Sequence, residues 1–123
     1  MNYAILLLMC CVLGACATVR GYDGPARPAA ELAVIEGAPS INAGLPLAPV
    51  IRKVDDRVVG VGYSKVVVAP GEHQVLVDCV MASTHRTTRH ALKFEVFPGR
   101  RYVLVADSGP GNRDCDAVHV DER

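Results

Sequence analysis

The chain has 123 residues, of which 13 are basic and 13 are acidic, so its formal net charge is zero. A neutral chain has no overall field that attracts nucleic acid, and we therefore expect no nucleic-acid partner. It contains four tyrosines, two phenylalanines and no tryptophan, so Val, Leu and Ile must build most of the core. These residues favour β-strands.

An almost unbroken apolar run covers residues 3–19. Its strongly apolar centre, residues 4–13, has the length of the hydrophobic region of a signal peptide and is short for a bilayer span. The small residues Gly14 and Ala15 follow directly, as a peptidase requires when it accepts an extended chain. Residues 1–15 are therefore predicted to be a signal peptide.

The residues Leu13-Gly14-Ala15-Cys16 resemble the lipobox of bacterial lipoproteins. This resemblance implies that the Cys16 thiol is joined to diacylglycerol, that residues 1–15 are removed, and that acyl chains hold the protein on a membrane. In such lipoproteins an Asp after the cysteine tends to retain the protein in the inner membrane. Ala17 stands there in this chain, which implies the outer membrane and its periplasmic face.

Other fates of the N-terminus stay open. Residues 1–3 lack the Lys or Arg that usually orients a signal peptide. Ala15-Cys16-Ala17 also fits an ordinary A-x-A cleavage site. An uncleaved membrane anchor and a buried N-terminal helix are further alternatives.

Residues 16–30 are predicted to form the lipidated N-terminus and a flexible tether, because they contain Gly21, Gly24, Pro25 and Pro28. Residues 31–123 are predicted to form one all-β domain, a small antiparallel β-sandwich of about seven strands. The expected strands are residues 32–35, 50–54 with 57–59 as a hairpin, 65–68, 73–81, 88–97, 101–106 and 117–120. Residues 39–49 read as a loop because of Gly44, Pro46 and Pro49.

Two segments of this domain resemble PEGA-type modules, which are small β-sandwiches of cell-surface and envelope proteins. The first is Val-Asp-Asp-Arg-Val-Val-Gly at residues 54–60, and the second is Val-Val-Val-Ala-Pro-Gly-Glu-His-Gln-Val-Leu-Val at residues 66–77. The resemblance covers roughly residues 50–80 and implies a turn-rich β fold more than an activity. Asp56 stands where these modules have a hairpin Gly, and their leading Pro-x-Gly-Ala segment is missing.

Removal of residues 1–15 and lipidation of Cys16 would leave Cys79 and Cys115 as an even pair. An exported domain meets an oxidising compartment, so we predict a disulfide between them. Strict alternation puts Cys79 with Val75 and Val77, but Cys115 with Ala117 rather than Val118. The pairing therefore requires a bulge or turn near the start of the last strand.

The most distinctive polar cluster is His85-Arg86-Thr-Thr-Arg89-His90. Its cations could bind phosphate, lipid A or acidic cell-wall polymers through charge-assisted hydrogen bonds, or could simply be solvated in a hairpin. We expect no metal site, no cofactor and no catalytic residue, since no nucleophile elbow, phosphate loop or H-E-x-x-H motif is present.

The sequence thus predicts a membrane-anchored envelope lipoprotein whose β-domain is a non-enzymatic structural or interaction module. Its expected partners are the membrane, through the lipid, and an envelope protein or cell-wall polymer. The alternative is a periplasmic module that binds a small ligand or metal through His85, His90 and nearby carboxylates.

Overall fold

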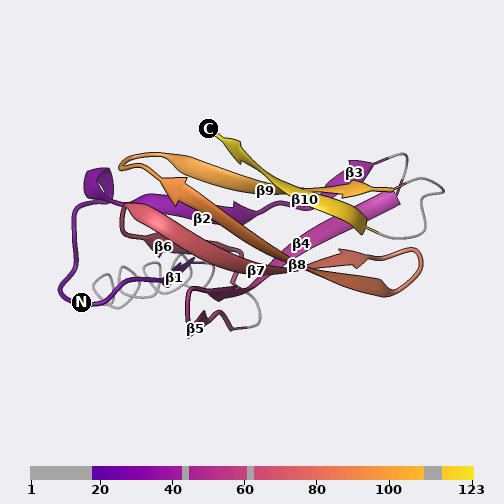
Figure 1. Cartoon of the computed structure of the whole chain (residues 1–123), viewed down its shortest axis with the longest axis horizontal. Helices are drawn as coiled ribbons and strands as arrows, with labels where there is room; N and C mark the ends of the chain where they lie inside the picture. The colour runs from indigo at the N-terminus through magenta and orange to yellow at the C-terminus, as the bar shows by residue number, and fades with distance from the viewer. Residues whose placement is uncertain (1–17, 43–44, 61–62, 110–114) are drawn as a thin grey trace, which may run out of the picture.

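The computed structural model describes residues 18–42, 45–60, 63–109 and 115–123, which form two sheets packed face to face (Figure 1). In strand order, the first sheet contains β1 (Thr18–Arg20), β6 (Lys65–Val68), β2 (Ala33–Gly37), β9 (Arg101–Ser108) and β10 (Cys115–Glu122). The second sheet contains β3 (Ser40–Asn42), β4 (Leu45–Val54), β7 (Gly71–Met81) and β8 (Arg86–Val96), with β5 (Arg57–Val58) paired to β4. One short 3-10 turn, η1 (Ala29–Glu31), precedes β2. The predicted all-β sandwich is confirmed.

Most neighbouring strands are antiparallel, as expected, but β1 runs parallel to β6 and β2 runs parallel to β9. No helix in the described part of the chain is long and apolar enough to cross a membrane.

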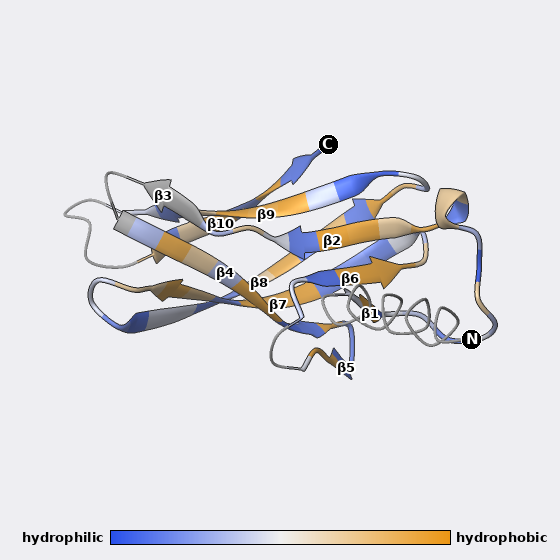
Figure 2. Cartoon of the chain, turned by 180° about the vertical axis from the view of Figure 1, so that it is seen from behind, coloured by the Kyte–Doolittle hydropathy of each residue, from blue (hydrophilic) through white to orange (hydrophobic). Residues whose placement is uncertain are grey.

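The core lies between the two sheets and follows the period-two alternation of the strands. In β7, Val75, Val77 and Cys79 are fully buried, and Val96 at the end of β8 is almost fully buried. Figure 2 shows the matching hydrophobic stretches in β2, β6 and β9, with hydrophilic residues toward the turns. The remaining core residues come from both sheets: Ala33, Ile35, Leu47, Ile51, Val54, Val59, Val66, Val68, Met81, Tyr102, Leu104, Ala106, Cys115 and Val118.

The predicted loop at residues 39–49 is wrong, because this segment contains β3 and the first half of β4. A proline lacks only the N–H donor, and its carbonyl can still take part in the sheet. The carbonyl of Pro46 accepts the N–H of Ala82 at 3.3 Å, and Pro49 lies opposite Cys79 in the β4–β7 pairing. On the side away from β7, this part of β4 is paired only with the three-residue β3, so donors missing on that side interrupt few hydrogen bonds.

The structure also differs from the predicted tether, because residues 18–20 form strand β1. Thr18, Val19 and Arg20 lie opposite Lys65, Val66 and Val67 of β6, and Val19 packs against the core. Without β1, the apolar strand β6 would be an open sheet edge, which is an unfavourable arrangement.

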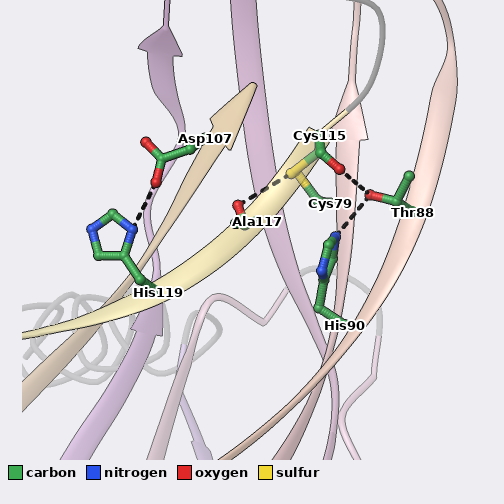
Figure 3. Close-up of a disulfide and its surroundings, with 7 residues drawn as sticks. All are labelled: Cys79, Thr88, His90, Asp107, Cys115, Ala117 and His119. Carbon is green, nitrogen blue, oxygen red and sulfur yellow. Dashed lines mark hydrogen bonds and ion pairs between the residues drawn. A yellow bond between two sulfur atoms is a disulfide. The ribbon is translucent and has the colours of Figure 1, made fainter. Parts of the chain in front are cut away.

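The predicted cysteine pair joins the two sheets. Cys79 of β7 and Cys115 of β10 lie at disulfide-bonding distance with a Cα–Cα distance of 6.1 Å, and both are buried (Figure 3). The required bulge is present: the β9–β10 register shifts between Cys115 and Ala117. This shift lets both Cys115 and Val118 face the core while Ala117 faces outward.

We predict that the Cys79→Ala/Cys115→Ala double variant loses about 3–4 kcal/mol of unfolding free energy, because the bond closes a loop that otherwise adds entropy to the unfolded chain. Urea unfolding of the variant and the oxidised protein measures this difference. Intact mass should show the oxidised chain lighter than its reduced form by two hydrogen atoms, and two freely alkylated thiols would contradict the pairing.

Candidate functional site

The predicted contact residues His85, Arg86, Arg89 and His90 lie at the β7–β8 hairpin, but they do not share one surface. His85 ends the turn with a positive φ of 55°, and Arg86 begins β8. Arg89 and His90 are consecutive strand residues, so their side chains lie on opposite faces of the second sheet. The structure therefore divides the predicted cluster into an outer part and an inner part.

The inner part lies beside the cysteine pair (Figure 3). The Thr88 hydroxyl donates to the carbonyl of Cys115 at 3.1 Å, and His90 Nε2 lies 2.9 Å from the same hydroxyl oxygen. A hydroxyl has one hydrogen, so the second bond forms when His90 Nε2 is the donor. His90 thus supports the junction between β8 and β10 rather than joining Arg89 in a ligand site.

The outer part centres on Asp78, the buried charged residue of β7, whose side chain is only 8% exposed. Arg89 of β8 donates to it from Nε at 2.9 Å and from Nη2 at 3.3 Å. Arg52 of β4 donates from Nε at 2.9 Å from the other side. These three residues form a charge ladder across β4, β7 and β8, which we call the Asp78 ladder.

The ladder holds the Asp78 carboxyl in its charged form. Hydrogen bonds from Arg89 are the strongest influence on its pKa; burial raises the pKa, but Arg89 and Arg52 together keep it below the usual value for Asp. Two arginines and one carboxylate leave the ladder with one net positive charge. The Arg52 and Arg89 side chains are 39% and 63% exposed, so their guanidinium groups can also bind an anionic group from solvent.

The first sheet carries a similar ladder on its outer face. Glu36 of β2 is 13% exposed and lies between Arg101 of β9, with Nε at 3.0 Å, and Lys65 of β6, with Nζ at 3.8 Å. In both sheets a poorly exposed carboxylate on an inner strand is flanked by cations from the two neighbouring strands. Such cross-strand pairs stabilise strand register, and here they also balance the negative charge of the carboxylate.

A third polar contact joins two turns. His73 Nδ1 lies 2.7 Å from Asp55 Oδ2, and its Nε2 lies 2.6 Å from the carbonyl oxygen of Ala69. The His73 side chain is only 11% exposed, although its place after the Pro-Gly turn is typical of a surface residue. Both partners accept hydrogen bonds, so the contacts are complete when both ring nitrogens carry hydrogen.

Asp55 occupies the left-handed region at φ 53° and also accepts the Gln74 N–H at 3.0 Å. Burial is the largest influence on its carboxyl and raises the pKa, but the Gln74 and His73 bonds outweigh it, so the pKa of Asp55 lies below its usual value. Sequence reasoning missed this contact because the two partners are 18 positions apart. Asp55 was visible only as a turn residue.

Within the described residues, no group of three or more His, Cys, Asp or Glu side chains is arranged to hold a metal ion. Cys16, the predicted site of lipid attachment, lies outside the described residues. No protein-family model, curated protein or solved structure matches the chain. The resemblances to lipoproteins and to PEGA-type modules therefore stay predictions.

We predict that Asp78→Asn lowers the free energy of unfolding by about 1–2 kcal/mol. The Asn side chain has only one acceptor oxygen, so its NH2 group would face one of the two arginines, and an arginine can only donate hydrogen bonds. Glu72→Gln is the matched control: Glu72 is also on β7 and pairs with Lys93 at 3.3 Å, but both side chains are largely exposed. Glu72→Gln should lower the free energy of unfolding by no more than about 0.5 kcal/mol. Urea unfolding at neutral pH measures both.

The effect of Asp78→Asn should depend on pH. A carboxyl whose pKa is lower in the folded state stabilises the fold above its unfolded pKa, and this contribution disappears as the pH falls through the folded value. The gap between wild type and Asp78→Asn should therefore shrink below about pH 4. If Asp78→Asn lowers the free energy of unfolding no more than Glu72→Gln does, the Asp78 ladder stabilises the fold no more than an exposed ion pair.

Proposed function

We propose that this chain is a lipid-anchored protein of the bacterial cell envelope whose β-sandwich is a non-enzymatic structural or interaction module. The observation that carries the proposal is Leu13-Gly14-Ala15-Cys16 at the end of an apolar run, followed at once by an all-β domain. The thiol of Cys16 is the nucleophile needed for thioether attachment, and its small neighbours suit a peptidase that binds an extended chain. Two or more acyl chains then give stable anchoring, whereas one is marginal.

The cysteine pair supports export. Cys79 and Cys115 are buried at bonding distance in the core of a small domain, where a disulfide persists only in an oxidising compartment. Placement in the outer membrane rests on Ala17 alone.

The polar clusters support a structural or interaction role. The carboxylates of Asp78, Glu36 and Asp55 are each held by cations or amides of neighbouring strands, and in these contacts they stabilise the sheets and turns. The surface most suited to a partner is the outer face of β8, where the Arg89 side chain is largely exposed. An acidic envelope polymer or an acidic protein segment would complement it.

Metabolic labelling with a clickable fatty acid tests the anchor. We expect label on the wild-type chain and none on Cys16→Ala, because no other cysteine stands at the end of the apolar run next to small residues. Cys10→Ala/Cys11→Ala is the matched control, which should keep the label since these residues belong to the removed segment. Equal labelling of wild type and Cys16→Ala would refute the proposal.

A further inference from the structure

The first described strand begins almost directly after the proposed lipid-attachment residue. Only Ala17 lies between Cys16 and Thr18. An extended chain spans at most about 3.6 Å per residue, so the Cα atoms of Cys16 and Thr18 lie within about 7 Å of each other. Thr18 is paired with Lys65 of β6, so the domain itself starts at that short distance from the anchor.

The segment after Thr18 is held firmly against the domain. The N–H of Gly21 donates to the carbonyl of Val67 at 2.7 Å, and a Cβ at Gly21 would collide with the Val66 side chain. Further along, Asp23 forms an ion pair with Arg57 of β5, and the Arg20 guanidinium lies 4.4 Å from the centre of the Tyr22 ring. Residues 18–23 are therefore part of the folded domain, and they do not act as a flexible linker between the anchor and the domain.

The strand order then fixes which side of the sandwich is nearest the anchor. One row of paired residues crosses the first sheet from edge to edge: Thr18, Lys65, Glu36, Val103 and Asp121. Adjacent strands are about 4.8 Å apart, so Asp121 on β10 lies about 19 Å from Thr18. The contact between Thr88 and Cys115 places β8 of the second sheet on the same distant side as β10.

The near side carries exposed apolar side chains. Val58 of β5 is 73% exposed and Tyr63, two residues before β6, is 36% exposed. Lys65 is 47% exposed and directly opposite Thr18. The Asp23–Arg57 ion pair brings β5 to the segment that follows β1, and Figure 2 shows both elements along the same side of the molecule. We call Thr18, Val58, Tyr63 and Lys65 the anchor edge.

We propose that the anchor edge lies against the surface of the bilayer, while β8 and β10 face away from it. This inference rests on the proposed lipidation of Cys16. The side chains of the anchor edge match a membrane surface. Tyrosines such as Tyr63 are enriched at the level of the lipid headgroups, and transfer of the exposed Val58 side chain out of water is favourable. The positive charge of Lys65 is attracted to anionic lipids. The lipid anchor brings these side chains within reach of the membrane, so no strong intrinsic affinity is needed.

Tryptophan fluorescence tests this orientation, because the natural chain has no tryptophan. The full lipidated chain is placed in vesicles of phosphatidylcholine and phosphatidylglycerol, with and without bromine on the acyl chains. Tyr63→Trp and, independently, Val58→Trp should lose fluorescence in brominated vesicles and shift their emission to shorter wavelength. Asp121→Trp is the matched control, since Asp121 is 47% exposed like Lys65 and lies at the far end of the same row. Its fluorescence should not change.

Flotation of the vesicles separates this inference from the proposed function. If the chain carries no lipid and does not float, the proposed function and the orientation both fail. If it carries lipid and floats, but Trp at positions 63 and 58 is quenched no more than Trp at position 121, the orientation alone is refuted.

Discussion

Each sheet of this domain buries one face against the other, and this shared core decides which way every strand side chain points. Neighbours such as Asp78 and Cys79 therefore have opposite environments: the carboxylate lies among arginines on the outer face, and the sulfur lies in the core beside Cys115. The same constraint separates Arg89 from His90. It also demands the bulge after Cys115, without which Cys115 and Val118 could not both face inward.

On the outer faces of the two sheets, poorly exposed carboxylates are paired with cations from neighbouring strands. Asp78 and Glu36 lie on inner strands, where long side chains from both neighbours reduce their exposure to water. Such a carboxylate is stable only when cations and hydrogen bonds replace the lost water. The flanking cations do this and at the same time tie three strands together. The net positive charge that remains on the Asp78 ladder is then available to a partner.

Part of this architecture could be predicted from local sequence. The alternation in residues 73–81 and 88–97 predicted β7 and β8 and their inward faces. The cysteine count predicted the pairing, and the alternation around Cys115 predicted the bulge. The first half of β4 was missed because its prolines weigh against a strand, although only their missing N–H matters at that position. The Asp78 ladder and the His73–Asp55 contact depend on register between distant strands, which composition and periodicity do not encode.

The N-terminal segment shows the same limit and has the largest consequence for function. Its glycines and prolines are typical of a tether, yet Gly21 is the residue that lets the chain lie directly against β6. Hydrogen exchange at the Gly21 amide in the native protein measures most directly whether the N-terminal segment is docked on β6. Docking of β1 predicts strong protection of that amide, comparable with the amides of β6. Exchange at the rate of an unstructured peptide would contradict the docking of β1 and would indicate a flexible tether between the anchor and the domain.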